Sequence, residues 1–448
     1  MLGRLTVYLC SSMKIAIVSS ILLVLTTMII SAQTPQQLAE IWEKNHISKL
    51  FPSDVRHKDL LVYIGQLKKL GLKVDEVGRS GANREIYQVE FGTGPLKIFM
   101  WSQMHGDEPT ATSALVDMLS YFQTHRDQEW VKNIEKAMTI RAVPMLNPDG
   151  AELYQRANLQ NLDINRDAVN LKSPEAQLLK KLRDDWTPVI GFNLHNEHAL
   201  TTVGKSTLEA AISLLVVYGD AAKTPSEGHD RNRRIASMMV TALQPFISGH
   251  IARYDDTYTA SAFGDNFSAW GTPTILIETG ELNGKDEMFL VKLNFIAFVT
   301  ALNAVATGSE RTADTLPYDT LIENGSGPLV HFVFRRANII SPDPGHAARI
   351  ADVAVITDRH RASGYGFAKI SNVSDSVASL GLSEYDASGF NVFGRFGTVK
   401  PGEIAEFFFY KKDRVVDWDA ANLETQFPPD AVFSGSKWIR GAGVVPKK

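Results

Sequence analysis

Short apolar runs alternate with segments of helical periodicity between about residues 33 and 310. The predicted strands cover residues 84–91, 96–101, 138–146, 189–194, 214–218 and 274–277. The predicted helices cover residues 109–122, 230–243 and 286–305, and a further one starts at Ser173-Pro174-Glu175. This alternation favours an α/β fold, a sheet with helices packed on its faces. In such folds, ligands gather at strand ends and the adjoining loops.

The pattern changes after about residue 310. The apolar runs there are short and alternating, and Gly, Pro, Ser and Asp residues separate them. They cover residues 329–334, 351–357, 367–373 and 403–410. This pattern is typical of a small β-sandwich-like domain. We therefore predict an α/β domain over residues 33–312 and a β-rich accessory domain over residues 313–448.

The N-terminus has the pattern of a secretory signal peptide. Lys14 precedes a mostly apolar run over residues 15–30, and Ser31-Ala32-Gln33 offers a cleavage site after Ala32. A transmembrane anchor is the alternative, but the run is short for a span and no basic residues follow it. We expect residues 1–32 to be removed, leaving a secreted or periplasmic chain without stable membrane insertion. Translation starts at either Met1 or Met13.

Charge and cysteine content narrow the possible partners and metal sites. The 448-residue chain has a formal net charge of -4, so no basic excess indicates nucleic-acid binding. Cys10 is the single cysteine of the chain, which excludes an intrachain disulfide and a zinc site built from several cysteines. Any metal must therefore be held by His, Asp and Glu. The sequence does not predict an oligomeric state.

His105 and Glu108 lie in the segment 102–109, where a predicted strand passes into a helix. Imidazole nitrogens and carboxylate oxygens are suitable zinc ligands, and Gly106 lets the backbone bend between them. A turn histidine followed by an acid at a helix N-terminus also gives this spacing. The pair alone therefore does not identify a metal site.

A catalytic zinc needs a third protein ligand and an open position. His195 directly follows the predicted strand 189–194, which places it at the end of that strand. His198 lies three residues further along, in a predicted loop, and is the alternative ligand. We prefer His195 because strand ends meet at the edge where the first pair is expected.

Arg156, Asn165 and Arg166 lie together in one irregular segment, and Glu278 ends the strand 274–277. Arginines bind carboxylates through a planar fork and can also stabilise a developing oxyanion. A solvated charged loop would explain the arginines equally well. Glu278 would be partly desolvated, which raises a carboxyl pKa and suits a general base. A structural carboxylate is the alternative for Glu278.

Taken in order, six features of residues 60–305 resemble the zinc carboxypeptidase family. They are a His-x-x-Glu pair, an arginine, an Asn-Arg pair, a strand-terminal histidine, a tyrosine-containing loop and a strand-terminal glutamate. Each is unspecific alone, and the shared order is what makes the resemblance specific. It implies a mixed central sheet with helices on both faces, one bound Zn²⁺ and a peptide substrate with a free C-terminal carboxylate.

The resemblance also implies a role for each matching residue. It makes His105, Glu108 and His195 the zinc ligands and Glu278 the base that accepts a proton from water and passes one to the leaving amine. Arg156 would polarise the scissile carbonyl, and Asn165 with Arg166 would hold the terminal carboxylate. Tyr258 matches a mobile tyrosine that closes over the substrate, with Tyr254 as the alternative.

The chain departs from the digestive members at Asp107, where they carry an arginine. The form His-Gly-Asp-Glu is closer to bacterial members and to the deacylase branch that includes succinylglutamate desuccinylase and aspartoacylase. We expect a zinc metallocarboxypeptidase, with cell-wall peptides as one candidate substrate class. Alternatives are a zinc amidohydrolase of N-acyl amino acids and a binding module with a degraded site. Asp265 could favour a basic terminal residue.

Overall fold

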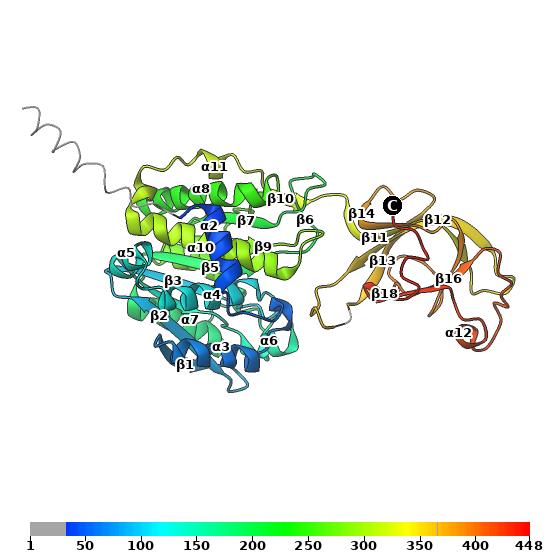
Figure 1. Ribbon diagram of the computed structural model, residues 1–448, viewed down its shortest axis with the longest axis horizontal. Helices are drawn as coiled ribbons and strands as arrows, with labels where there is room; N and C mark the ends of the chain where they lie inside the picture. Colours follow the sequence, from blue (N-terminus) through cyan, green and yellow to red (C-terminus); the bar gives the residue numbers. More distant parts are fainter. Residues whose placement is uncertain (1–32, 365) are drawn as a thin grey trace, which may run out of the picture.

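A computed structural model describes residues 33–364 and 366–448, so the predicted signal peptide lies outside the described residues. Figure 1 shows two parts, each built around a sheet. The first contains an eight-stranded sheet with the order β1-β2-β4-β3-β5-β9-β7-β8. These strands are β1 Lys73–Arg79, β2 Glu85–Gly92, β3 Leu96–Ser102, β4 Met138–Val143, β5 Ile190–Asn196, β7 Ile212–Val217, β8 Ile251–Arg253 and β9 Thr274–Thr279.

This sheet is mixed, as predicted. Strands β4, β3, β5 and β9 are neighbours and run parallel. Strands β1, β2 and β7 join it through antiparallel pairs. Because β3, β5 and β9 run side by side in one direction, their carboxyl ends meet at one edge of the sheet. The polar residues singled out from the sequence lie at this edge or in the loops that follow it.

Helices cover both faces of the sheet, also as predicted. Alternate residues of β3 point to opposite faces: Met100 belongs to one apolar cluster and Trp101 to another. The larger cluster packs under α2 Pro35–Asn45, α3 His57–Lys69, α4 Thr110–Thr124, α5 Glu129–Ala137, α8 Glu227–Ile247 and α10 Glu287–Thr307. The smaller cluster packs under α7 Pro174–Trp186 and α9 Phe263–Ala269. Two short helices, α6 Pro148–Leu153 and α11 Leu316–Asp319, complete this part.

Helix α10 has the length and hydropathy of a membrane span, the single such helix among the described residues. In this fold 72% of its most apolar window is buried. Asp286 caps its first turn, and Gly308 ends it in a left-handed conformation with φ 72°. A helix that is apolar all round is what a central core position between several other helices requires.

The second part is β-rich, as predicted, but its strands form one hydrogen-bonded sheet rather than two. The order is β13-β12-β11-β15-β16-β17-β18, with β14 also paired to β11. These strands are β11 Leu329–Ile340, β12 Ala348–Thr357, β13 Ala368–Ser374, β14 Leu380–Asp386, β15 Phe390–Gly394, β16 Phe407–Lys411, β17 Ala431–Ser434 and β18 Lys437–Arg440. A short helix, α12 Leu423–Gln426, precedes β17.

This sheet curls around an aromatic core. Phe334 on β11 and Phe433 on β17 are three strands apart in the sheet, which is roughly 14 Å if the sheet is flat. Their ring centroids are 5.1 Å apart. A bulge follows Phe334, where Arg336 has φ 57°, and it divides the part of β11 that pairs with β14 from the part that pairs with β15. The curl and the bulge give a sandwich-like core from a single sheet.

Residues just beyond the predicted boundary at 312 and 313 contact the α/β part. The Tyr318 hydroxyl in α11 accepts a hydrogen bond from the backbone N–H of Val216, at 2.8 Å. Strand β10 Asn324–Ser326 pairs with β6 Thr201–Val203. The position of the boundary stays a prediction.

Candidate metal centre

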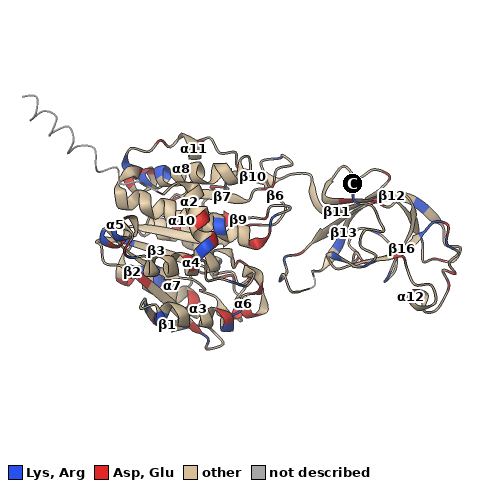
Figure 2. Ribbon diagram, viewed as in Figure 1, with Lys and Arg blue, Asp and Glu red and all other residues tan. Residues whose placement is uncertain are grey.

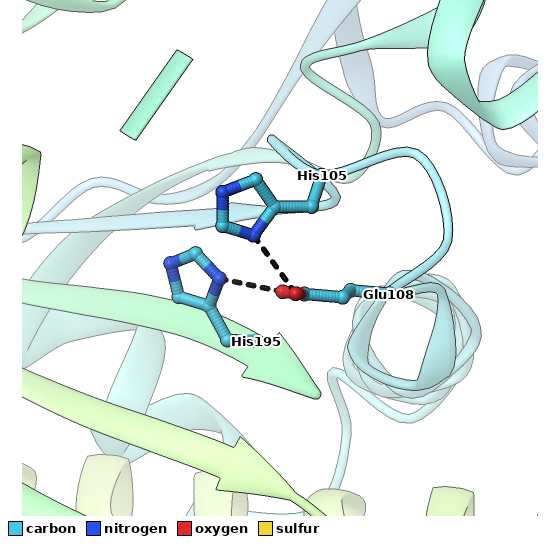
Figure 3. Close-up of side chains that lie close together, drawn as sticks. All are labelled: His105, Glu108 and His195. Carbon is cyan, nitrogen blue, oxygen red and sulfur yellow. Dashed lines mark hydrogen bonds and ion pairs between the residues drawn. The ribbon is translucent and has the colours of Figure 1, made fainter. Parts of the chain in front are cut away.

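His105, Glu108 and His195 come together at the edge of the α/β sheet, as Figure 3 shows. The Nδ1 atom of His105 lies 2.8 Å from Oε1 of Glu108, and Nδ1 of His195 lies 2.6 Å from Oε2. One candidate ligand atom from each residue lies within 4.8 Å of the others, and all three side chains are buried. The alternative ligand His198 is exposed and does not belong to this cluster.

The chain path explains why these three meet. His105 and Glu108 occupy the turn between β3 and α4, and His195 lies near the end of β5, the parallel neighbour of β3. The turn packs tightly against the start of α6: a Cβ at Gly106 would lie 1.9 Å from the carbonyl carbon of Gly150. Glycine is therefore required at this position by close backbone approach, beyond the flexibility expected from the sequence.

The donor set fits a zinc ion. His105 Nδ1 is buried without a well-directed hydrogen-bond partner, although it lies close to Glu108, so its lone pair is available to a metal. Its other nitrogen, Nε2, lies 3.0 Å from Oδ1 of Asp163. A carboxylate at that distance fixes Nε2 as the protonated nitrogen and orients the ring, as behind many metal-bound histidines.

The ionisation states also suit a cation. Burial alone would raise the pKa of Glu108, but the two imidazoles outweigh it and hold the pKa well below its usual range. Burial lowers the pKa of His195. Burial has the same effect on His105, but the Glu108 and Asp163 carboxylates outweigh it and raise the pKa. A metal bound at Nδ1 of His105 would displace a proton from that nitrogen and leave the proton on Nε2.

Glu278 lies on β9 directly beside His195 of β5 in the strand register. Its side chain is buried and lines a cavity of about 590 Å³ together with His105 and Glu108 of the cluster. Burial, reinforced by the Glu108 and Glu197 carboxylates, raises its pKa well above the usual value. The raised pKa agrees with the expectation from the sequence and suits a proton acceptor.

Arg156 reaches the cluster through two carboxylates. Its Nη1 lies 3.2 Å from Oε1 of Glu108, and its Nε donates to Oδ2 of Asp163 at 3.0 Å. Burial would raise the pKa of Asp163, but the His105 and Arg156 contacts outweigh it and lower the pKa. Asp163 therefore links a metal-ligand candidate to an arginine. The sequence gives a weak signal for this role, a carboxylate two residues before Asn165-Arg166.

Asn165, Arg166, Tyr254 and Tyr258 also line this cavity. Asn165 and Arg166 lie in the short helical turn Ile164–Arg166, where Oδ1 of Asn165 accepts a hydrogen bond from the N–H of Phe263 at 2.9 Å. Arg166 donates from Nη1 to the backbone oxygen of Asn165 at 2.8 Å. The structure thus brings the predicted substrate-binding residues to the predicted metal ligands. Which tyrosine closes over a substrate stays a prediction.

Sequence patterns do not single out Arg359, yet it reaches this site from the β-rich part. Its guanidinium donates to the backbone oxygens of Asp107, Asn196 and Glu197. The residue lies 252 positions from Asp107 in the chain, in a loop without a recognisable motif. No local signal could have found it.

The model of the zinc carboxypeptidase family matches residues 66–296, more than half of the chain. The chain belongs to the zinc carboxypeptidase family. This finding agrees with the resemblance of the sequence motifs, and the family implies a zinc ion for the His-Glu-His cluster.

Curated relatives in this family match over shorter stretches. A probable carboxypeptidase 2 of Arthroderma benhamiae is 30% identical over 121 residues, which are 27% of this chain and 23% of that protein. Carboxypeptidase 2 of Trichophyton rubrum is 28% identical over 100 residues, which are 22% of this chain and 18% of that protein. The chain thus spans less than a quarter of the length of these relatives.

Two bacterial metallo-carboxypeptidases are among the solved structures that the chain matches. A metallo-carboxypeptidase from Burkholderia cenocepacia is 16% identical, with a TM-score of 0.46 over 56% of this chain and 69% of that chain. A metallo-carboxypeptidase from Pseudomonas aeruginosa, solved in complex with (2-guanidinoethylmercapto)succinic acid, is 15% identical, with a TM-score of 0.45 over 56% of this chain and 69% of that chain.

Proposed function

We propose that this protein is a zinc-dependent metallocarboxypeptidase that removes the C-terminal residue of peptides. One observation carries the proposal: two residues of the His105, Glu108 and His195 cluster, His105 and Glu108, line one cavity of about 590 Å³ together with the base candidate Glu278 and the arginines. A metal site, a proton acceptor and a carboxylate-binding group in one cavity are what C-terminal peptide hydrolysis requires.

The chemistry follows from the positions of the side chains. A zinc ion held by His105, Glu108 and His195 would supply a water of lowered pKa and polarise the scissile carbonyl. Glu278 accepts the proton of that water and donates a proton to the leaving amine, for which its raised pKa is suited. Arg156 stabilises the negative charge that develops on the carbonyl oxygen. Asp163 holds the Arg156 guanidinium in place.

Recognition of the free carboxylate makes the enzyme an exopeptidase. Arg166 binds the carboxylate as a cation, and Asn165 is fixed beside it through the N–H of Phe263. Tyr258, or Tyr254 in its place, covers the substrate in the cavity that both line. Asp265 lines the same cavity and favours a basic terminal residue, although its Oδ1 already accepts a bond from the N–H of Thr259.

The partner is a peptide rather than a nucleic acid. The net charge of -4 gives no basic excess, and Figure 2 shows acidic and basic residues interspersed over the α/β part. The N-terminal pattern supports action outside the cytoplasm, and peptides of the cell wall are a candidate substrate there. N-terminal sequencing of the exported protein tests this location: a start at Gln33 supports it, and an intact N-terminus in the cytoplasm contradicts it.

An activity assay tests the proposed reaction. Purified full chain is incubated with a peptide library, with the same peptides amidated at the C-terminus, and with N-acyl amino acids. The expected result is loss of single C-terminal residues from the free peptides, abolished by a chelator and restored by zinc. Release of acyl groups would instead support the amidohydrolase alternative. Turnover that is absent or insensitive to the chelator would reject both.

A further inference from the structure

A loop of the β-rich part, residues 358–364 between β12 and β13, reaches the metal centre of the α/β part. Arg359 in this loop donates from Nη1 to the backbone oxygen of Asp107 at 2.9 Å. Its Nη2 donates to the backbone oxygens of Asn196 at 3.2 Å and Glu197 at 2.6 Å. Three of the five guanidinium N–H groups are thereby bound to backbone carbonyls of the α/β part.

These carbonyls belong to the two segments that carry the metal-ligand candidates. Asp107 directly precedes Glu108, and Asn196 directly follows His195. One planar guanidinium thus bridges the turn after β3 and the end of β5. The fork geometry fixes both segments at once, which a single point charge could not do. Nη1 also lies 3.9 Å from Oε1 of Glu108, so the cation faces the carboxylate of the cluster.

We propose that Arg359 is a positioning residue of the metal centre, and that through it the β-rich part completes the site of the α/β part. Arg359 acts through the backbone of the two ligand-bearing segments, because most of its donors are already bound there. The turn itself, residues 105–108, contains no arginine or lysine that could take this place.

A second arginine of the same loop supplies a matched control. Arg361 donates from Nη1 to the backbone oxygen of Ser53 at 2.9 Å, and from Nη2 to those of Ala151 at 2.6 Å and Glu152 at 2.9 Å. Its guanidinium lies 5.0 Å from the centroid of the Tyr154 ring. Arg361 therefore holds the loop on the α/β part with the same kind of bonds, but it touches no segment with a metal ligand.

The test compares Arg359→Ala, Arg359→Lys and Arg361→Ala in the full chain. Zinc affinity is measured by competition with a chromogenic chelator, and kcat and KM are measured on a peptide cleaved by the wild type. We expect Arg359→Ala to lower zinc affinity and kcat by about tenfold or more, as removal of groups that orient metal ligands does, with KM within about threefold. Added guanidinium ion restores part of both losses. Arg361→Ala stays within about threefold of the wild type.

Two results would overturn the inference. One is a wild-type zinc affinity in Arg359→Ala. The other is an equal loss in Arg359→Ala and Arg361→Ala, which would reduce Arg359 to a docking contact. If Arg359→Ala does not fold, Arg359→Lys tests the inference instead. The lysine ammonium cannot span the three carbonyls, so the same loss of zinc affinity is expected. A wild-type zinc affinity in Arg359→Lys would contradict the inference.

The kinetic measurements rest on the proposed function, whereas the zinc measurements do not. A wild type that binds zinc but cleaves no peptide, combined with lost zinc affinity in Arg359→Ala, would reject the proposed function and retain this inference.

Discussion

Two buried carboxylates, Glu108 and Glu278, lie in opposite electrostatic environments at the residue scale. Both are desolvated, which raises a carboxyl pKa. For Glu108 the imidazoles of His105 and His195 outweigh burial and lower the pKa. For Glu278 the neighbouring Glu108 and Glu197 carboxylates add to burial and raise it. In the proposed function, this separation of the two pKa values suits Glu108 to binding the metal and Glu278 to proton transfer.

Glu278→Gln tests the base directly. The amide keeps the size of the side chain but cannot accept the proton, so kcat is expected to fall by about 10²- to 10⁴-fold while the zinc content stays at the wild-type level. Steady-state kinetics and elemental analysis measure the two quantities. Glu281→Gln, three residues along on the following loop, is the control and is expected to keep its activity. Near wild-type turnover in Glu278→Gln would show that the base is another group.

Arg166→Ala tests recognition of the terminal carboxylate. A hydrogen bond to a charged group contributes about 1.5–3 kcal/mol, so KM for peptides with a free C-terminus is expected to rise by about tenfold to a hundredfold. Peptides amidated at the C-terminus lack that charge and should change little. An equal rise in KM for both substrate sets would contradict the assigned role.

The site residues that the sequence could predict are those whose position follows from a strand end or a short motif. His105, Glu108, His195 and Glu278 are of this kind, because adjacent parallel strands bring their carboxyl ends together. Arg359 is not, because its contacts arise from packing between segments 252 residues apart. The close contact that requires glycine at position 106 could not be predicted either, because the backbone of Gly150 comes near Gly106 only in the folded chain.

At the element scale, burial decides which strands can be recognised from the sequence. Strands β3, β5 and β9 lie inside the sheet, parallel to one another, and are apolar on both faces, so they stand out as continuous apolar runs. Strand β1 is an edge strand of mostly charged and exposed residues and carries no such run. The predicted strand 138–146 ends at Val143 instead, because Pro144 has no N–H to donate to the ladder.

In the β-rich part, the sequence pattern could not predict the order in which the strands pair. Strand β14 runs parallel to β11 although β12 and β13 lie between them in the chain. The alternating runs predict strands but not which strands become neighbours. One curled sheet and two stacked sheets therefore give the same periodicity, and the sandwich-like expectation was correct for the core but not for the number of sheets.

The turn between β3 and α4 gives a prediction at this scale. Gly106→Ala would place a Cβ 1.9 Å from the carbonyl carbon of Gly150, so the turn must shift and move His105 and Glu108. We expect zinc affinity and kcat to fall by about tenfold or more. Gly65→Ala is the control, because a Cβ at Gly65 in α3 meets nothing within 4 Å. Chelator competition that gives equal zinc affinities for both variants and the wild type would contradict this account of the turn.

At the scale of the whole molecule, the β-rich part must be stable for its loop to reach the metal centre. Arg335 on β11 joins the strands on either side, with Nη1 2.9 Å from Oδ2 of Asp352 on β12 and Nε 3.1 Å from Oε2 of Glu384 on β14. Burial raises the pKa of Asp352, but bonds from the N–H of Arg336 and from Arg335 outweigh it, so the net pKa is lowered. The contacts of Arg335 with Asp352 and Glu384 therefore stabilise the sheet next to the bulge in β11.

Asp352→Asn is expected to lower the free energy of unfolding by about 2 kcal/mol at neutral pH, since it removes the charge that Arg335 faces. The folded-state pKa lies below the usual value of 3.8, so the stabilisation is present above that pH and is lost as pH falls through the folded pKa. Denaturant unfolding from neutral pH down to about pH 3 measures the difference. The exposed Asp375→Asn is the control and should show no change. A difference that is independent of pH would contradict the electrostatic origin.

Zinc content tests the His105, Glu108 and His195 site most directly. Elemental analysis of the purified full chain is expected to find about one zinc per molecule in the wild type and in His198→Ala, because His198 lies outside the cluster. His195→Ala loses one of three ligands and should retain less than about a tenth of that zinc. A wild type without zinc, or a His195→Ala variant that keeps it while His198→Ala loses it, would contradict the site.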